Sequence, residues 1–373
     1  MIEYSPEWDA FRNIKDKMKP TICASCRNDD GRRSNTYGHC AKCLENQAYN
    51  TDLVETSLFI MDKYPREYHD GGVHDVFKST PLRMPGEHPY LYYGIEIEVE
   101  FNSDYVDVFE DYDGAFTDKI KTILDEFSNI TEGMFVYERD GSLENGVEFI
   151  SRPTSYPKWV DKGTVEKMKN GFQFLINNGA YIKQPDSNGL HIHISRKFFD
   201  YGKTGRNNRD EAYQDMDWLF QFFQKELEAL GGRNYTSYCA SKVDKIKERY
   251  GIGRRQNDDE FNAEFTVKGK LKKGGRIPRG DHYSAVNMSG PTIEARIFNS
   301  TVDYKRVLSY IEIMRNFAHA VRDGEIEGKT LNQILNTKDN LYLDGLVREV
   351  RNELYKSGRR LTLTRKNKDE IVF

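Results

Sequence analysis

The sequence predicts a domain of the α+β class, in which a largely antiparallel sheet is flanked by long helices. Two observations predict it. Residues that alternate between apolar and polar, as in half-buried strands, recur in four segments, at 90–101, 134–153, 189–199 and 282–299. Helical patterns lie among these segments without a regular strand–helix alternation, and such an order favours hairpin-connected strands over a parallel sheet.

Three helices are expected from apolar residues that recur every three or four positions. The segment 114–128 carries such a stripe, and so do 211–230 and 303–321, where Asp303 is a candidate N-cap. We interpret the stripes as core-facing, and they consist of Ile120, Ile123, Leu124 and Phe127, of Met216, Leu219, Phe220, Phe223 and Leu227, and of Val307, Tyr310, Ile311, Met314, Phe317 and Val321.

Four parts are expected along the chain: a zinc ribbon at 1–48, a connector or lid at 49–88, the main domain at 89–325, and a helical extension with a basic tail at 326–373. The ribbon is inferred from a C-x2-C-x13-C-x2-C pattern, which is typical of a structural Zn²⁺ site with four thiolate ligands. Two disulfides are the alternative, which a reducing compartment disfavours. The four cysteines are Cys23, Cys26, Cys40 and Cys43.

Composition excludes some classes of partner. The chain has 373 residues, a net charge of -4 and a pI near 6.1, so no global basic field exists to hold nucleic acid or an anionic membrane. Nucleic-acid binding would therefore be local, through the ribbon or the basic stretches 268–282 and 359–368, although a solvated surface is the simpler interpretation of both stretches. No apolar run approaches the ~20 residues of a membrane span, and signal-peptide features are missing. We expect a cytoplasmic protein with no membrane partner.

Three carboxylates alternate with aliphatic residues in the run GIEIEVE, residues 94–100. Glu96, Glu98 and Glu100 would share one face of a strand, roughly 7 Å apart at successive positions. Like charges at this spacing raise each other's pKa unless a cation neutralises them, so a divalent metal is one interpretation. An edge strand with a solvated acidic face is the other.

The remaining strand segments have the same two-faced design. His191 and His193 share a face in GLHIHIS, and Glu294 and Arg296 share a face in TIEARIF. The run DGSLENGVEFIS adds Asp140, Ser142, Glu144 and Glu148 around a predicted turn. Further arginines are Arg152, Arg276 and Arg279. Carboxylates, imidazoles and arginines that converge on one face suit hard divalent cations together with phosphates.

Five segments in one order carry a family resemblance. The segments YYGIEIEVE, ERDGSLENGVEFISRP, NGLHIHISR, HYSAVN and EARIFNSTVDYKRVLSYI resemble the amidoligase branch of the carboxylate-amine ligase superfamily, relatives of glutamine synthetase and glutamate-cysteine ligase. The resemblance covers roughly residues 88–325 and leaves out the ribbon. It implies a curved, mostly antiparallel sheet in the form of a half-funnel. It also implies an ATP-dependent ligase that forms an amide bond through an acyl phosphate, with Mg²⁺ or Mn²⁺ ions in its site.

The resemblance also implies roles for residues that match the family's motifs. The implied metal ligands are Glu96, Glu98, Glu148, His191 and Glu294, and Glu100 is a further acidic candidate. Arg296 resembles the arginine that meets the transferred phosphoryl group. Asp140 and Glu144 are candidates for the base that accepts a proton from the amine. Candidates for contacts with the nucleotide or the substrate are His193, Arg276, Arg279, Arg152 and Ser142.

The resemblance does not identify the acid or the amine, and the expected substrates range over amino acids, peptides, proteins and modified macromolecules. Two other functions fit some of the same residues. A metal-dependent hydrolase would use carboxylates and histidines to activate water. A nonenzymatic adaptor would bind a protein or nucleic acid through the ribbon and would leave the acidic face solvated. Consumption of ATP distinguishes the ligase from both.

Overall fold

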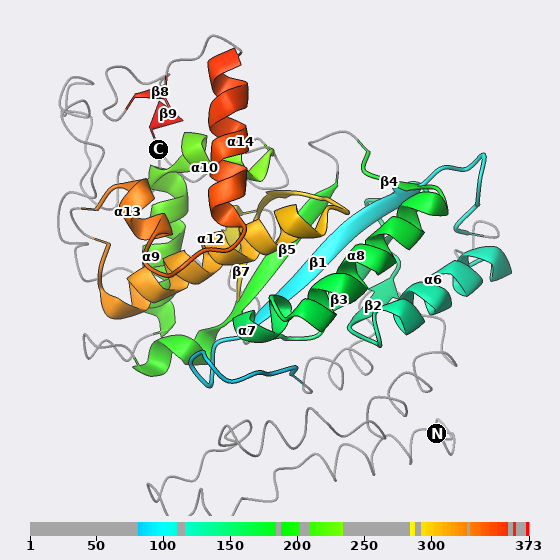
Figure 1. Ribbon diagram of the computed structural model, residues 1–373, viewed down its shortest axis with the longest axis horizontal. Helices are drawn as coiled ribbons and strands as arrows, with labels where there is room; N and C mark the ends of the chain where they lie inside the picture. The colour runs from blue at the N-terminus through cyan, green and yellow to red at the C-terminus, as the bar shows by residue number, and fades with distance from the viewer. Residues whose placement is uncertain are drawn as a thin grey trace, which may run out of the picture. The chain divides into compact units, whose positions relative to one another are not determined.

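The predicted α+β class is confirmed by a computed structural model of the chain (Figure 1). The structure describes residues 81–109, 116–183, 188–201, 209–233, 284–287, 292–326, 329–356, 361–362 and 371–372. Within these ranges helices and strands are mixed, and antiparallel pairing predominates. The predicted ribbon with its four cysteines, most of the connector, and both Arg276 and Arg279 lie outside the described residues.

The chain divides into two compact units. The first contains the residues up to Gly94 together with Glu100–Tyr181, and the second contains Ile95–Val99 together with the residues from Ile182 onward. Strand β1 (Tyr93–Phe101) therefore contributes its ends to the first unit and its middle to the second. Each unit is described separately below.

In the first unit the strand order is β2-β3-β1, and β4 pairs with the end of β1. Strands β2 (Phe135–Glu138) and β3 (Gly146–Ser151) form an antiparallel hairpin, and β4 is Ala180–Tyr181. Helix α6 (Asp118–Ile130) contacts α8 (Lys162–Asn177), which follows the short α7 (Tyr156–Trp159).

The helix predicted over 114–128 is α6, and it begins at Asp118 because the Thr117 side chain caps it by accepting a hydrogen bond from the amide of Ile120. All four residues of the predicted stripe are buried. The core of this unit is largely aromatic, and Phe127 is its centre, since its ring lies within 4.7–6.3 Å of three other rings, those of Phe135, Phe149 and Phe172.

In the second unit the strand order is β1-β5-β7-β6. Strand β5 (Gly189–Ser195) is antiparallel to β7 (Thr292–Asn299), and β7 is antiparallel to β6 (Val286–Asn287). Asn287, Glu294 and His193 are cross-strand partners, so they lie at one level of three neighbouring strands.

A β-bulge interrupts the pairing of β5 with β7. Leu190 pairs with Phe298 and Ile192 pairs with Ala295, so β7 has one more residue than β5 in this interval. Strict alternation would place Phe298 on the same face as Arg296. With the extra residue in between, Phe298 instead stacks on Tyr310, and their ring centroids are 4.5 Å apart.

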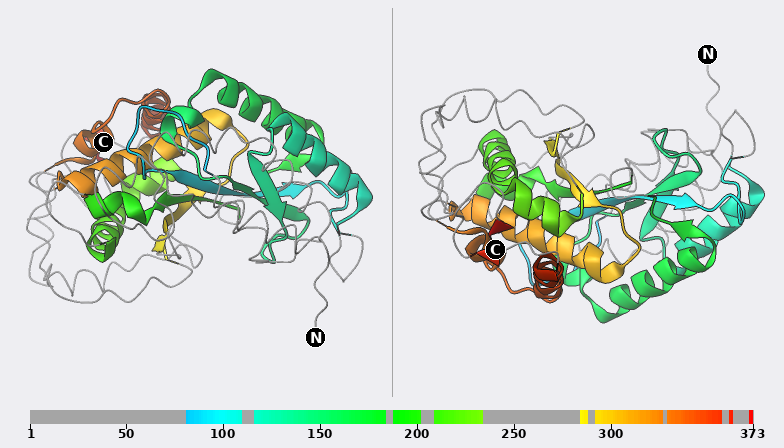
Figure 2. Two further views of the ribbon diagram at one scale, coloured as in Figure 1. Left: turned by 90° about the horizontal axis from the view of Figure 1, so that it is seen from below. Right: turned by 90° about the horizontal axis from the view of Figure 1, so that it is seen from above.

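Most of the other described elements of the second unit are helices (Figure 2). The central one is α12 (Tyr304–Asp323), which contacts strand β5 and helices α9 (Arg209–Phe222), α13 (Leu331–Leu335) and α14 (Leu343–Lys356). As predicted, Asp303 caps α12, because its side chain accepts a hydrogen bond from the amide of Lys305 at 3.0 Å. A 3₁₀ helix, η1 (Arg196–Tyr201), and the two-residue strands β8 (Leu361–Thr362) and β9 (Ile371–Val372) complete the unit.

The single helix predicted over 211–230 is in fact two helices, α9 and α10 (Gln224–Gly231). They meet at Phe223, whose φ of -100° and ψ of 26° are not helical. The predicted apolar stripe is nevertheless buried along both helices, and Phe223 itself is fully buried. No proline or glycine marks this break in the sequence, so tertiary packing decides it.

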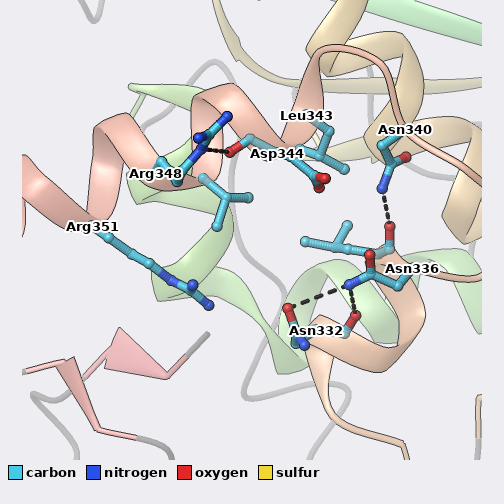
Figure 3. Close-up of a pocket in the computed structure, with 9 residues that line it drawn as sticks. Asn332, Asn336, Asn340, Leu343, Asp344, Arg348 and Arg351 are labelled. Carbon is cyan, nitrogen blue, oxygen red and sulfur yellow. Dashed lines mark hydrogen bonds between the residues drawn. The ribbon is translucent and has the colours of Figure 1, made fainter.

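The segment between α13 and α14 is attached to α12 by a buried carboxylate. Glu312 is fully buried and accepts backbone hydrogen bonds from Leu341, Tyr342 and Leu343 at 2.8, 3.0 and 2.6 Å. A groove of about 430 Å³ beside α13 and α14 is lined by residues such as Asn336 and Arg348 (Figure 3), and no predicted site residue contributes to its lining. Among the described helices, none is both long and apolar enough to cross a membrane.

Tyr310 makes the second unit sensitive to alkaline pH. Its hydroxyl donates a hydrogen bond to the carbonyl oxygen of Gly231 at 3.0 Å, and burial raises its pKa to about 12, although Arg306 opposes the rise. A folded pKa above the unfolded value of about 10 stabilises the protein below pH 10, and this stabilisation is lost as the pH rises through 12. The difference of two units between the folded and unfolded pKa values corresponds to a loss of about 2.7 kcal/mol in the free energy of unfolding.

We expect Tyr310→Phe to remove this contribution. Denaturant unfolding from pH 8 to pH 12 should show a smaller decline in the free energy of unfolding for the variant than for the wild type. Equal declines in the two proteins would show that the Tyr310 phenol does not ionise differently in the folded and unfolded states.

Candidate metal centre

Four strands of the second unit present polar side chains on one face. Their alternating aliphatic residues are buried, with 0–1% exposure for Ile95, Ile97, Val99, Ile192, Ile194, Ile293 and Ala295. Burial of this aliphatic face leaves the alternate positions together on the other face of the strands. We call the group of acidic and imidazole side chains found there the carboxylate–imidazole cluster, and it consists of Glu96, Glu98, His191, His193 and Glu294.

Glu96 lies between the two imidazoles. One carboxylate oxygen, Oε1, is 3.0 Å from Nε2 of His193, and the other, Oε2, is 3.3 Å from Nδ1 of His191. The orientation of His193 is fixed from its other side, where Nδ1 is 3.0 Å from the Thr292 hydroxyl. Glu96 therefore links β1 with both histidines of β5.

Glu294 is held in place through both of its oxygens. Its Oε1 accepts a hydrogen bond from Nη1 of Arg296 at 2.6 Å and is 3.6 Å from Nδ1 of His191. Its Oε2 accepts a hydrogen bond from the side-chain amide of Asn287 at 3.1 Å. The carboxylate thus has one orientation, with Oε1 directed toward the imidazole and the guanidinium.

Glu98 is nearly fully buried, at 4% exposure. Its Oε2 accepts a hydrogen bond from the amide of Gly189 at 2.5 Å, and its Oε1 is 3.6 Å from Nε2 of His191. The main-chain carbonyl of Glu98 accepts a hydrogen bond from the Ser300 hydroxyl at 2.6 Å. The two ring nitrogens of His191 therefore face different carboxylates, with Nδ1 toward Glu96 and Glu294 and Nε2 toward Glu98.

Within the carboxylate–imidazole cluster, neighbouring positive charges favour the ionised forms of Glu96 and Glu294. Burial alone would raise the pKa of Glu96, but His193 and His191 outweigh it and hold that pKa well below the usual value. Burial likewise opposes ionisation of Glu294, yet the two histidines lower its pKa, with help from Arg296. Burial also acts against the charge of Arg296, and Glu294 raises the pKa of this guanidinium. Both glutamates can therefore serve as anionic ligands at neutral pH.

The cluster fits a divalent cation. Glu96, His193 and Glu294 each offer a ligand atom within 4.8 Å of the others. His191 supplies a further nitrogen, and it is only 2% exposed. Within the described residues, Nε2 of His191 has no hydrogen-bond partner, although buried polar atoms normally have one. Carboxylate oxygens are ligands that Mg²⁺ and Mn²⁺ prefer, and Mn²⁺ in particular also accepts an imidazole nitrogen.

Several predicted site residues lie in the first unit, in and around the turn between β2 and β3. Glu100 uses both carboxylate oxygens to accept backbone hydrogen bonds, from Glu144 at 3.0 Å and from Asn145 at 2.8 Å. Asp140 accepts a hydrogen bond from the amide of Ser142 at 2.7 Å, which shapes the same turn. Glu100 and Asp140 therefore already have structural partners in this turn.

A cavity of about 410 Å³ in the first unit is lined by Glu100, Glu144 and Tyr181, among others. Two further first-unit candidates, Glu148 and Arg152, are buried, whereas Ser142 is exposed. Glu148 lies on β3 opposite Glu138, and burial lowers the pKa of Arg152 to about 10, so this arginine still carries its charge at neutral pH. The roles assigned to these residues stay predictions.

Three residues near the cluster were not identified from the sequence. Asn287 binds Glu294, and its position in the segment HYSAVN was the only available signal. Gly189 and Arg233 adjoin His191: a Cβ atom added at Gly189 would lie 2.8 Å from Nε2 of His191 and 2.4 Å from Nη1 of Arg233. Gly189 lies in the segment NGLHIHISR, but Arg233 lies in none of the five segments. The roles of both residues follow from contacts between distant parts of the chain.

Comparison with known proteins finds a family match for this chain. Residues 91–318 match a family model described as "Putative amidoligase enzyme". Among solved structures, the chain is similar to the glutamine synthetase of Plasmodium falciparum, with 11% identity, a TM-score of 0.33, and coverage of 72% of this chain and 55% of that one. No curated protein sequence matches it.

A second similar structure is the complex between prokaryotic ubiquitin-like protein Pup and its ligase PafA, with 10% identity, a TM-score of 0.27, and coverage of 73% of this chain and 59% of that one. The present chain thus spans less than two thirds of the length of either structure.

The family match includes β1, β5, β6 and β7, and so it includes every residue of the carboxylate–imidazole cluster. It extends over more than half of the 373 residues. This chain belongs to the amidoligase family.

Proposed function

We propose that this protein is an ATP-dependent carboxylate–amine ligase. The substrate carboxylate attacks the γ-phosphorus of ATP to form an acyl phosphate and ADP, and an amine then displaces phosphate to form an amide. The observation that carries the proposal is the largely buried carboxylate–imidazole cluster with Arg296 bound to Glu294 at 2.6 Å. It combines anionic ligands for a metal with a fixed cation for a phosphoryl group.

The residues that would hold a divalent ion are Glu96, His191 and Glu294, with Glu98 and His193 beside them. Mg²⁺ or Mn²⁺ bound there would offset negative charge on the phosphates of ATP. The chain's contribution is orientation, because each side chain has a second partner that restricts its rotation. His193 is held by Thr292, for example, and Glu98 is held by Gly189.

Arg296 is proposed to stabilise the transferred phosphoryl group. Its side chain is 10% exposed and held by Glu294, so its remaining N–H groups keep a defined direction. A guanidinium matches phosphate oxygens with forked, charge-assisted hydrogen bonds. A fixed cation of this kind stabilises charge that spreads over the equatorial oxygens in the transition state.

The attacking amine must lose a proton, and Glu144 is our first candidate for the base. Its side chain is exposed and lines the cavity of about 410 Å³ in the first unit. Asp140 is the second candidate, although it already binds the amide of Ser142. Ser142 and Arg152 are proposed to contact the nucleotide or the substrate, together with Arg276 and Arg279. The proposed acids and amines are amino acids, peptides or larger molecules that carry these groups.

The test is an activity assay on the full-length protein. The protein is incubated with ATP, Mg²⁺ or Mn²⁺, and a mixture of amino acids whose carboxylates carry ¹⁸O. The proposal predicts ADP, a condensed product by mass spectrometry, and ¹⁸O in the released phosphate, because the attacking carboxylate oxygen leaves with phosphorus. Glu98→Gln should suppress all three. Glu353→Gln removes an exposed carboxylate of α14 and should leave them unchanged.

The assay also separates the alternative functions. A metal-dependent hydrolase would cleave amide bonds without consuming ATP. An adaptor would neither consume ATP nor respond to Glu98→Gln. Formation of ADP without ¹⁸O in phosphate would retain ATP use but exclude the acyl phosphate.

A further inference from the structure

We infer that Arg233 is a positioning residue for the metal centre, an inference that rests on the proposed function. It belongs to a Gly231-Gly232-Arg233 segment that begins with the last residue of α10. The segment lies directly on β7: a Cβ atom at Gly231 would be 2.7 Å from the carbonyl oxygen of Ile297, which no side chain could tolerate. Gly232 forms a β-bridge with Phe298 and has a φ of 70°, which favours glycine. The two glycines thus allow the segment to pack against β7, and Arg233 therefore lies beside the cluster.

Arg233 is buried, at 2% exposure, and touches the backbone on two sides of the cluster. Its Nη1 donates a hydrogen bond to the main-chain carbonyl of Arg296 at 3.1 Å. The same Nη1 would be 2.4 Å from a Cβ atom at Gly189, so the guanidinium lies against the backbone of Gly189 with no space between them. Nε2 of His191 faces the same point, at 2.8 Å.

Two chains of contacts lead from Arg233 to proposed metal ligands. The first passes through the Arg296 carbonyl, at the bulge of β7, to the Arg296 side chain and then to Glu294. The second passes through Gly189, whose amide directs Oε2 of Glu98. Residues that orient the ligands of a metal are themselves important to its binding. Arg233 takes part in both series of contacts, because its guanidinium contacts the backbone at Arg296 and at Gly189.

Two effects of replacing Arg233 by a neutral residue would change the affinity for a divalent cation in opposite directions. Removal of a positive charge close to the cluster would by itself strengthen the binding of a cation. Loss of the Arg296 hydrogen bond and of the contact with Gly189 would instead free Glu294 and Glu98 to move, which weakens binding. The direction of the change therefore reports which effect of Arg233 dominates.

The experiment measures Mn²⁺ binding to the full-length protein, by the EPR signal of free Mn²⁺, without ATP or substrates. We expect Arg233→Met to weaken Mn²⁺ binding by about tenfold or more, since partners of metal ligands typically contribute that much. Arg233→Lys keeps the charge but not the planar fork, so it should also weaken binding. The control is Arg83→Met: Arg83 is a buried arginine of the first unit, 7% exposed, that donates a hydrogen bond to a backbone carbonyl, that of Glu87.

Thermal unfolding of each variant shows whether it is folded at the temperature of the titration, and Arg233→Lys carries the test if Arg233→Met does not fold. Unchanged or tighter Mn²⁺ binding in a folded Arg233 variant would overturn the inference. Equal weakening by Arg83→Met would also overturn it, because the effect would then be general loss of stability. Failure of the wild type to bind Mn²⁺ would contradict the proposed metal centre itself, and the two failures are therefore distinguishable.

Discussion

Replacement of Glu294 by glutamine is expected to lower the rate of amide formation by about 10³ or more. The substitution keeps the size of the side chain but removes the negative charge that faces Nδ1 of His191 at 3.6 Å. It also removes the counter-charge of Arg296, which is bound at 2.6 Å. A metal ligand and an oriented arginine together contribute several kcal/mol to stabilisation of the transition state, and about 4 kcal/mol corresponds to a factor of 10³.

The hydrogen bonds of Glu294 predict a stability effect as well. Oε2 accepts a hydrogen bond from Asn287 at 3.1 Å, while Oε1 accepts one from Arg296. A glutamine has one oxygen and one amino group, so one of these two donors would face another donor. An unsatisfied buried donor costs about 1–3 kcal/mol. We expect denaturant unfolding of Glu294→Gln to show a loss in this range.

The measurements for Glu294→Gln are ADP formation, Mn²⁺ binding and unfolding, each compared with Glu353→Gln. Glu353 is an exposed residue of α14 and supplies the same change of charge away from the cluster. Wild-type turnover by Glu294→Gln would exclude Glu294 from the site. Loss of stability with wild-type Mn²⁺ binding would make its role structural.

Replacement of Gly189 by alanine is the second large effect that we expect. The added Cβ would lie 2.4 Å from Nη1 of Arg233 and 2.8 Å from Nε2 of His191, closer than non-bonded atoms can approach. Both neighbouring side chains are buried, at 2% exposure each, so neither can simply rotate into solvent. The strand or the two side chains must shift, and overpacking of this kind typically costs about 1–3 kcal/mol of stability.

The same shift should weaken Mn²⁺ binding by Gly189→Ala, by about tenfold or more. The reason is that the Gly189 amide orients Glu98 through a 2.5 Å hydrogen bond. Isothermal calorimetry with Mn²⁺ and thermal unfolding would measure the two effects on the same samples. Substitution of this glycine without any change in Mn²⁺ affinity would show that the site tolerates movement of β5.

Gly345→Ala is the matched control for this substitution. Gly345 lies in α14, and a Cβ added there meets nothing within 4 Å. Alanine is favoured over glycine inside a helix by about 0.5–1 kcal/mol, so this variant should be as stable as the wild type or more stable. A similar loss of stability in Gly189→Ala and Gly345→Ala would mean that the effect at Gly189 is not specific to the cluster.

The sequence predicted much of the fold because its strands and helices are strongly patterned. Alternation with aliphatic residues identified the polar faces of β1, β5 and β7, and with them all five residues of the carboxylate–imidazole cluster. Spacing of apolar residues identified α6 and α12, each with its buried stripe. These patterns are local, since a strand repeats every two residues and a helix every 3.6, and a single segment is enough to recognise them.

Other features of the site have no local signature. Glu100 follows the same alternation as Glu96 and Glu98, yet its carboxylate binds the turn at Glu144 and Asn145. Alternation assigns a side chain to a face of a strand, but it does not say which partner the side chain meets there. No local sequence pattern predicts the division of α9 from α10 at Phe223. The same is true of the stacking of Phe298 on Tyr310 at the bulge.

By itself, then, the amino-acid order determined the class of fold, the strands that carry ligands and the family to which these motifs point. Only the tertiary structure decided that Asn287 restrains Glu294, that Gly189 directs Glu98, and that Arg233 joins both sides of the cluster. The physical reason is the distance along the chain. Contacts between Arg233 and Arg296 or between Gly189 and Glu98 join residues 63 and 91 positions apart, and such contacts exist only after the strands have assembled.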